Sequence, residues 1–423
     1  MRTLLTRVFR FAAKVFFRRI EVVGLENIPQ SGPVIFAANH PNGLVDPLFI
    51  LCFAPRPVSF LAKAPLFRYP VIGWFARAIE AIPVYRRQDN VAGTNQETFS
   101  RAREVLSGGG AIAIFPEGTT HSDARLKELK TGAARIALGA RLDAISVIPA
   151  GIYYTEKYTF RSEALVWFGK PIAVGLESAD ADGEPDREAA ERLTGEIERG
   201  LAEVTLQADS HYALDLVRRA ERIFSGGAEN LAEELELRRR FVEGYAFLRE
   251  RDAARLAGLE KTMARFEAEL HAARLDPQTL EARGVHISGK TLAILLVLLP
   301  VAAIGAVINY PTYRLIGLLA RRIVKSESEL TATVKVIGAF LLYPLTWIAI
   351  AALVGWRLGW AAGLLSLIAV PLSAYVALRF FEQLDDVIGR ARALVRRRAR
   401  GALIRLRETI REEFRAVAEE MEG

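Results

Sequence analysis

His40 and Asp46 are the residues of this sequence whose types and spacing best suit acid–base chemistry. They follow an apolar run at 34–38, and the turn-forming tripeptide Pro-Asn-Gly at 41–43 lies between them. A neutral imidazole accepts a proton near pH 7, and a nearby carboxylate can fix its tautomer and stabilise the imidazolium. A loop at the end of a buried strand would place both groups within reach of a substrate. The structural alternative is that His40 caps a turn while Asp46 faces water.

Three further apolar runs also end in residues that suit substrate binding. The run 82–84 leads into Arg86 and Arg87, the run 111–115 into Pro-Glu-Gly-Thr at 116–119, and the run 146–148 into Pro149. The four stretches therefore stand in one order along the chain: His/Asp, basic, Pro-Glu-Gly and apolar-Pro.

This order resembles the glycerolipid acyltransferase family, which makes lysophosphatidate and phosphatidate from acyl thioesters. The resemblance covers residues 20–175, and the Asn39-His40 strand end beside Phe115–Thr119 is its most specific part. One spacing differs, because five residues (41–45) separate His40 from Asp46 where the family usually has four. Gly43 permits the turn to absorb the extra residue.

The resemblance implies a role for each motif residue. His40 would remove the proton from a glycerol hydroxyl and Asp46 would orient it, with direct transfer and no covalent acyl-enzyme. Glu117 and Gly118 look like the family's acceptor-binding pair. A guanidinium can bind phosphate oxygens bidentately, so Arg86 is the first choice for the acceptor phosphate. The other expected contributors are Lys63 and Arg87 at the phosphate, Lys127 and Lys130 at CoA phosphates, Thr119 as a helix cap, and Asn39 and Pro149 as supports of the site.

The elements that must position these residues alternate between strands and helices. Such alternation predicts an α/β domain at 21–178, a mixed β-sheet flanked by helices. Expected strands lie at 34–38, 58–61, 82–84, 111–115, 146–148 and 164–168, and expected helices at 70–80, 94–106 and from 126. The glycines match no dinucleotide-binding or P-loop pattern.

Residues 1–20 predict a basic amphipathic helix that lies in a membrane interface. Six basic residues and no acid occur there, and apolar residues recur at helical spacing. Charges interrupt the segment, so a secretory signal is not expected. The alternative is a helix packed on the domain with a solvated basic face.

The region 179–285 predicts two or three long helices after an acidic segment at 180–186. It is rich in Ala, Glu, Leu and Arg and carries no catalytic motif. It would pack on the catalytic domain or pair with another copy, and the sequence leaves both open.

The region 286–380 predicts a membrane part, followed by a charged helical tail at 381–423. The runs 336–356 and 358–378 are each long enough to cross a hydrocarbon core of about 30 Å. The run 291–313 contains Pro300 and Pro311. Basic residues lie between the first and second runs and again after the third run. Loops rich in Lys and Arg prefer the cytoplasm, so both of these segments are expected on the cytoplasmic side. Two crossings satisfy this expectation if 291–313 is re-entrant or lies in the membrane plane. Three ordinary spans are the alternative.

The composition agrees with a soluble domain joined to a membrane part. Hydrophobic residues make up 51% of the chain and charged residues 25%, with a net charge of +7. This charge favours an anionic partner, such as anionic lipid or a phosphate-bearing substrate. In the basic tail at 390–422, no aromatic residues for base stacking are interleaved with the arginine cluster at 396–400 and acidic residues are interspersed, so nucleic acid is not expected. Cys52 is the only cysteine, which excludes an intrachain disulfide.

Together these features predict an acyltransferase of the inner (cytoplasmic) membrane with its catalytic domain facing the cytoplasm. The donor would be acyl-CoA or acyl carrier protein, used as a co-substrate without cofactor or metal. The acceptor would be 1-acyl-glycerol-3-phosphate, glycerol-3-phosphate or another lysophospholipid. Two other hypotheses remain open: a metal-dependent phosphoesterase using His40, Asp46, Glu117 and His121, and a non-enzymatic membrane scaffold.

Overall fold

The computed structural model describes residues 2–43, 45–85, 95–157, 159–176, 185–225, 230–280, 288–323, 330–395 and 397–423. The chain divides into two compact units. Unit 1 comprises Met1–His211 and Asn230–Leu235, and unit 2 comprises Tyr212–Glu229 and Glu236–Gly423.

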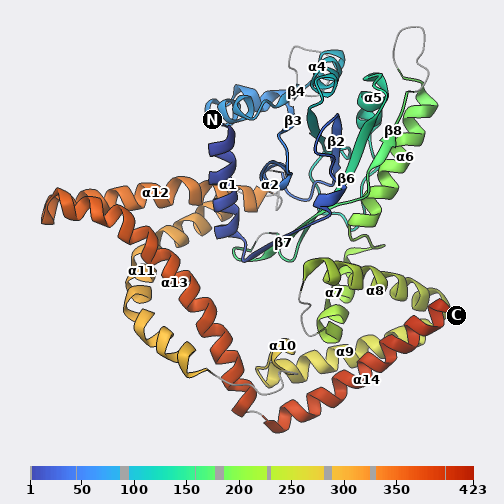
Figure 1. Ribbon diagram of the computed structural model, residues 1–423. Coiled ribbons are helices and arrows are strands. Elements are labelled where there is room, and N and C mark those ends of the chain that lie inside the picture. The colour runs from blue at the N-terminus through green and yellow to red at the C-terminus, as the bar shows by residue number, and fades with distance from the viewer. Residues whose placement is uncertain are drawn as a thin grey trace. The chain divides into compact units, whose positions relative to one another are not determined.

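Unit 1 contains an eight-stranded mixed sheet in the order β1-β7-β6-β2-β5-β3-β4, with β8 paired to β6 (Figure 1). Strand β6 runs antiparallel to β7 and β8, whereas the other pairs are parallel. The strands are β1 (Arg19–Val23), β2 (Val34–Ala38), β3 (Val58–Lys63), β4 (Ile82–Val84), β5 (Ala111–Ile114), β6 (Ile145–Tyr154), β7 (Glu163–Phe168) and β8 (Ile172–Val174). The predicted α/β class with a mixed sheet is confirmed.

Helices cover both faces of the sheet, which explains why β2 is apolar at every position. Ile35 and Ala37 lie in a buried cluster with residues of α4, α5 and α6, while Phe36 contacts Phe168 on the opposite face. Figure 1 shows α5 and α6 on one side of the sheet and α1 and α2 on the other. The helices of this unit are α1 (Arg2–Phe16), α2 (Val45–Phe53), α3 (Pro70–Ala78), α4 (Asn95–Ser107), α5 (Gly132–Gly139) and α6 (Arg187–Val204).

The helix expected from residue 126 begins later, at Gly132. The preceding segment is a loop whose amides bond to the Pro-Glu-Gly turn: Lys127 N donates to Glu117 Oε2, and Lys130 N donates to Pro116 O. In a helix that began at 126, Lys130 N would bond to the carbonyl of residue 126, but here it bonds to the Pro-Glu-Gly turn instead.

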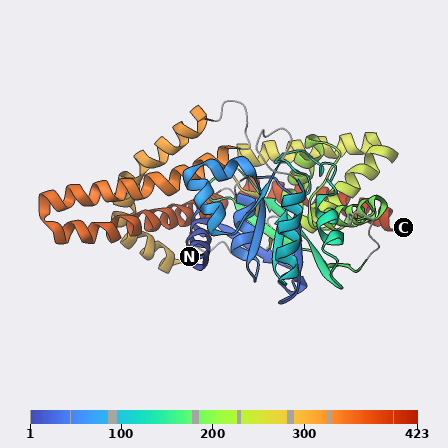
Figure 2. The same cartoon turned by 90° about the horizontal axis from the view of Figure 1, so that it is seen from above.

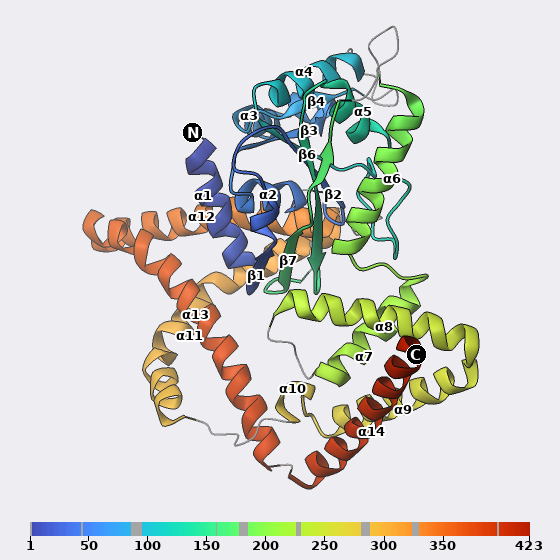
Figure 3. The ribbon, with the colours of Figure 1, turned by 45° about the vertical axis from the view of Figure 1, so that its right-hand side comes forward.

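Unit 2 is helical. Its helices are α7 (His211–Ser225), α8 (Leu231–Arg251, from Glu236 onward), α9 (Ala253–Ala272), α10 (Pro277–Leu280), α11 (Gly289–Ile323), α12 (Leu330–Leu358), α13 (Trp360–Val395) and α14 (Arg397–Glu422). One buried cluster joins Leu216, Leu248, Phe266 and Ile410, so the C-terminal α14 shares a core with α7, α8 and α9. Figure 3 shows α14 beside α9.

Three helices of unit 2 are long and apolar enough to cross a membrane: Gly289–Arg322, Val334–Leu358 and Trp360–Arg392. Helices α12 and α13 form a hairpin that turns at Gly359, whose φ of 94° lies in the left-handed region that glycine tolerates. Figure 2 shows the two helices running side by side. Helix α11 remains helical through Pro300 and Pro311.

Candidate active site

The register of the parallel strands brings His40 and Glu117 to the same edge of the sheet. Ala37 of β2 pairs with Ile114 of β5, and His40 and Glu117 each follow three residues later. Carboxyl ends of parallel strands share one edge, where ligands of open α/β sheets usually bind. The loops then join, because His40 N donates to Glu117 Oε1 at 3.0 Å and His121 N donates to His40 O at 3.3 Å.

His40 and Asp46 form a hydrogen-bonded pair. Asp46 lies in the first turn of α2, and its Oδ2 is 2.9 Å from His40 Nδ1. A carboxylate oxygen only accepts, so His40 Nδ1 carries the hydrogen and Nε2 keeps its lone pair. Among the described residues no hydrogen bond reaches Nε2. The imidazole is partly exposed and stacks on Phe115 with ring centroids 4.1 Å apart. The pair can therefore accept a proton at Nε2.

Asp46 is fully buried and is held by three donors. Besides His40, Asn42 N donates to Oδ2 at 2.6 Å and the Tyr154 hydroxyl donates to Oδ1 at 2.6 Å. Burial raises the pKa of Asp46, and the hydrogen bonds from His40, Tyr154 and Asn42 oppose this rise. Burial and the adjacent carboxylate raise the pKa of Tyr154 well above its usual value, so the phenol remains a donor.

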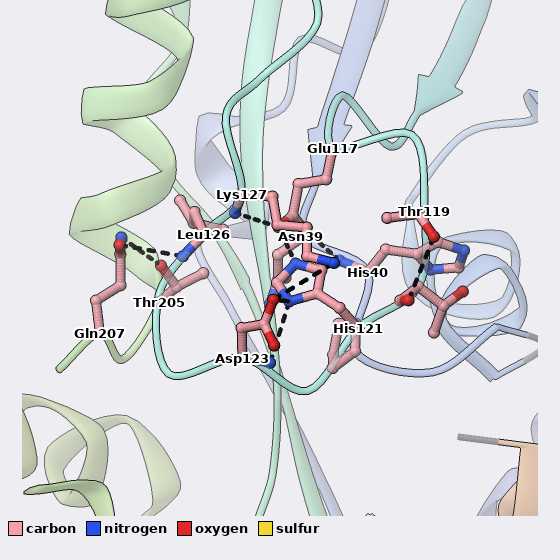
Figure 4. A network of polar contacts seen from close by, with 12 residues as sticks. Asn39, His40, Glu117, Thr119, His121, Asp123, Leu126, Lys127, Thr205 and Gln207 are labelled. Carbon is pink, nitrogen blue, oxygen red and sulfur yellow. Dashed lines mark hydrogen bonds and ion pairs between the residues drawn. The ribbon is translucent and has the colours of Figure 1, made fainter. Parts of the chain in front are cut away.

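Glu117 organises the loop on the other side of His40 (Figure 4). Its side chain is buried, with Oε1 accepting from His40 N and Oε2 accepting from Lys127 N at 2.9 Å. His121 completes the set, because its Nδ1 accepts from Asp123 N and its Nε2 therefore donates to Glu117 Oε2. Both carboxylate oxygens thus bond to the protein, and the contact of Glu117 with a substrate hydroxyl stays a prediction.

Gly118 brings a cation to the same loop. Its φ is +69°, and a Cβ built there would lie 2.7 Å from Lys130 Nζ. Lys130 is exposed, so its ammonium stands beside the Pro-Glu-Gly turn and faces solvent. A residue with a side chain at 118 would displace this ammonium and strain the backbone.

Asn39 fixes the His40 loop to β6. Its Oδ1 accepts from Ile152 N at 2.7 Å, and its Nδ2 donates to Ile152 O at 3.0 Å. Lys157 binds the same loop from the other end, donating to Pro41 O at 3.1 Å and to Ser122 Oγ. Both side chains hold backbone that flanks His40, as the sequence predicts for Asn39.

The remaining predicted site residues are not all gathered. Arg86 and Arg87 lie outside the described residues. Lys63 is exposed at the end of β3, on the shared carboxyl edge. The expectation that Thr119 caps the next helix is wrong, because Thr119 Oγ1 contacts Thr120 O within the loop and α5 begins at Gly132.

Sequence reasoning missed Tyr154 and gave His121 only a metal-ligand role. Tyr154 lies in β6, five residues after Pro149, and only the strand register shows that its hydroxyl points to Asp46. His121 follows Glu117 at a spacing of four residues, and this spacing could have predicted a hydrogen bond between their side chains. In the described part of the chain, no group of three or more His, Cys, Asp or Glu side chains is placed to hold a metal ion.

Comparisons with known proteins find similar sequences. Residues 19–153 match the family model described as Acyltransferase. Glycerol-3-phosphate O-acyltransferase 1 of Saccharomyces cerevisiae is 26% identical over 74% of this chain and 54% of its own length. The chloroplastic 1-acyl-sn-glycerol-3-phosphate acyltransferase LPAT1 of Arabidopsis thaliana is 30% identical over 33% of this chain and 38% of its own length. The chain thus spans about half or less of these two relatives.

The crystal structure of the 1-acyl-sn-glycerophosphate acyltransferase PlsC from Thermotoga maritima is similar with a TM-score of 0.36. It shares 23% sequence identity, over 48% of this chain and 80% of that protein. The matched family region contains His40, Asp46, Glu117 and Gly118 and ends one residue before Tyr154. Residues 19–153 of this chain therefore form a domain of the acyltransferase family.

Proposed function

We propose that this chain is a membrane-associated acyltransferase that transfers a fatty acyl group from acyl-CoA to a hydroxyl of 1-acyl-glycerol-3-phosphate. Glycerol-3-phosphate is the second candidate acceptor, and both acceptors occur in the names of the similar proteins. The observation that carries the proposal is the His40–Asp46 pair, whose hydrogen bond leaves Nε2 as a proton acceptor at the carboxyl edge of the sheet.

The proposed reaction needs no covalent intermediate on the protein. His40 Nε2 takes the proton of the acceptor hydroxyl while its oxygen attacks the thioester carbonyl. The C–S bond then breaks, the electron pair leaves with the CoA sulfur, and the imidazolium returns the proton to that thiolate. Asp46 stabilises the imidazolium that forms between the two steps. The products are the acylated acceptor and free CoA.

Two cations are proposed to bind phosphate near this centre. Arg86 remains a prediction from the sequence. Lys130 is supported by its exposed ammonium beside Gly118 on the loop that Glu117 connects to His40. An ammonium serves as a point charge for a phosphate, whereas a guanidinium adds bidentate geometry.

The test is acyl transfer by the purified full-length protein with radiolabelled acyl-CoA. The acceptors are 1-acyl-glycerol-3-phosphate, glycerol-3-phosphate and a lysophospholipid with a zwitterionic headgroup. We expect His40→Ala to lower kcat by about 10²–10⁴-fold, the usual contribution of a positioned proton acceptor. His211→Ala, which alters an exposed histidine of α7, is the matched control and should leave the rate unchanged. Full activity of His40→Ala would contradict the mechanism, and no transfer by the wild type to any acceptor would contradict the function.

Helix α1 is proposed to contact the membrane surface. Leu4, Val8 and Phe11 are exposed on one side of the helix, between the exposed cations Arg7 and Lys14. An apolar stripe bordered by cations suits the interface of an anionic bilayer. This surface supports delivery of an acceptor that already resides in lipid.

We also propose that the α12–α13 hairpin crosses the membrane and that α11 is re-entrant. The first half of α11 packs on the middle of α13: Leu295 and Ala302 share a buried cluster with Phe380, and Gly305 lies against Ser373 O. The second half of α11 packs on α12. From the middle of α11 towards either of its ends, the contacted residues of α12 and α13 therefore lie farther from the hairpin turn at Gly359.

The contacts with α12 are polar and follow an antiparallel register. Trp347 Nε1 donates to Asn309 Oδ1 at 2.9 Å, and the hydroxyls of Thr312 and Thr346 are 2.8 Å apart. Closer to the end of α11, Ile316 contacts Gly338. Since both halves of α11 lead away from the turn, its two ends would lie on the side where α12 begins and α13 ends. This side carries the basic clusters, which prefer the cytoplasm together with the catalytic domain.

A further inference from the structure

Tyr154 is the one side chain other than His40 that donates a hydrogen bond to the Asp46 carboxylate among the described residues. Its hydroxyl lies 2.6 Å from Oδ1, the oxygen not used by His40 and Asn42. A buried carboxylate must have its oxygens satisfied, because an unpaired buried acceptor is costly. We propose that Tyr154 is a positioning residue of the catalytic pair, which sets both the orientation of Asp46 and the proton affinity that Asp46 gives to His40. This inference rests on the proposed acyl transfer.

The phenol ring has little freedom to leave this position. It is 8% exposed and lies against Phe17 and Phe49, with ring centroids 5.7 and 5.6 Å away. Phe17 directly follows α1, and Phe49 lies in α2, three residues after Asp46. Packing from two helices therefore fixes the ring, and the ring fixes the hydroxyl at Oδ1.

The hydrogen bond to Oδ1 also has an electrostatic consequence. A donor on a carboxylate withdraws charge from it and lowers its proton affinity. Without the Tyr154 hydroxyl, the Asp46 carboxylate would keep more of its negative charge and would stabilise the His40 imidazolium more strongly. A higher pH would then be required to regenerate the proton-accepting form of the pair. The other polar groups around it are Asn42 N at Asp46, Glu117 and His121 at the His40 backbone, and Lys157 at Pro41.

Tyr154→Phe tests the proposal because it removes the hydroxyl and retains the ring. We expect kcat to fall by about tenfold or more, the scale of a lost hydrogen bond to a charged group. We also expect the acid limb of the kcat profile to move to higher pH, with KM for the acyl donor nearly unchanged. Tyr153→Phe is the matched control: it removes the same hydroxyl from the neighbouring position of β6, where Tyr153 packs against Leu165. This control should keep both the rate and the profile.

A second readout is independent of turnover. The pH dependence of His40 modification by diethyl pyrocarbonate, followed by peptide mass spectrometry, reports the protonation of the imidazole in either variant. Tyr154→Phe should shift the midpoint of His40 modification upward, whereas Tyr153→Phe should not. A lower kcat with an unchanged pH profile and an unchanged midpoint would show a purely structural role and overturn the inference, as would an unaffected kcat. If the wild type transfers no acyl group, the proposed function fails, and the midpoint of modification still decides the role of Tyr154.

Discussion

Asp46 shows how one buried side chain serves activity at the expense of stability. Its carboxylate must be ionised to orient His40, yet burial favours the neutral acid. The donors at His40, Asn42 and Tyr154 reduce this conflict without removing it, since the pKa of Asp46 is still raised. Buried ionisable groups with a shifted pKa, such as Asp46, occur mainly at functional sites.

Asp46→Asn should therefore separate the two properties. We expect kcat to fall by about 10²-fold or more, because a neutral amide cannot stabilise the imidazolium. Because its pKa is raised in the folded protein, ionised Asp46 destabilises the folded state at neutral pH. This penalty is absent below the pKa that Asp46 has in the unfolded chain, where the carboxyl is protonated in both states. The variant should hence be the more stable protein above the folded-state pKa of Asp46, and its advantage should shrink as pH falls towards the unfolded value.

Thermal unfolding of both proteins across pH 4 to 8, with an acyl-transfer assay, is the measurement. A variant that is less stable than the wild type at neutral pH would contradict the assigned direction of the Asp46 pKa shift. The comparison is informative because the amide is nearly isosteric: its oxygen can accept from His40 and Asn42, while its NH2 can donate to the Tyr154 hydroxyl oxygen.

At the scale of elements, the strand ends are what the sequence predicts well. Apolar runs that stop at Asn39-His40 and at Pro116-Glu117 were sufficient to place both motifs at one sheet edge, because parallel neighbours end together. The fold class and the pairing of His40 with Asp46 follow from the same reasoning. The extra residue between them is accommodated in the turn before α2.

The details that the sequence did not predict depend on contacts between distant segments. The sequence did not show that the Glu117 oxygens accept hydrogen bonds from the amides of His40 and Lys127 and from His121 Nε2. Tyr154 reaches Asp46 only because β6 extends past Pro149 beside β2. Local patterns carry no information about which donor a buried oxygen will meet, and such partners are set by tertiary packing.

Strand β6 is also held at its back by α6, and this contact is testable. A Cβ at Gly151 would lie 1.9 Å from Val204 O, at the C-terminal end of α6. A backbone atom cannot rotate away as a side chain can, so helix and strand would have to separate. We expect Gly151→Ala to lower the free energy of unfolding by about 1–3 kcal/mol, as overpacking does.

Gly175→Ala is the matched control, because no atom lies within 4 Å of its added Cβ. The measurement is chemical denaturation of the two variants, with the unfolding of unit 1 followed by fluorescence. Equal stability of Gly151→Ala and Gly175→Ala would show that α6 does not press on β6 as the structure has it. Because Ile152 anchors Asn39, a loss of activity in Gly151→Ala is expected to accompany the loss of stability.

At the scale of the whole molecule, the chain combines an acyltransferase domain with a helical part that carries three apolar helices. The proposed lipid acceptor and lipid product would explain why such a domain is joined to helices that are long and apolar enough to cross a membrane. The number of crossings decides whether the segments before and after α11 lie on the same side of the membrane. The sequence is compatible with two crossings and with three.

Labelling of single cysteines by a charged, membrane-impermeant maleimide distinguishes these arrangements. Burial raises the pKa of the native Cys52 to about 12, so its thiol should react little and the background should be low. Ser288→Cys precedes α11, Ser326→Cys lies between α11 and α12, and Leu358→Cys lies at the exposed turn of the hairpin. A re-entrant α11 predicts that 288 and 326 label from one side of sealed vesicles and 358 from the other.

Three ordinary spans would instead put 288 and 326 on opposite sides, and a hairpin that does not cross would put 326 and 358 on the same side. Either result would overturn the proposed arrangement. The contacts favour the first outcome because a straight α11 lying along the hairpin would approach Gly359 with one of its ends, whereas its contacts on α12 and α13 both lead away from that turn. The polar pair Asn309–Trp347 then has a physical role, since it satisfies an amide that would otherwise be costly in hydrocarbon.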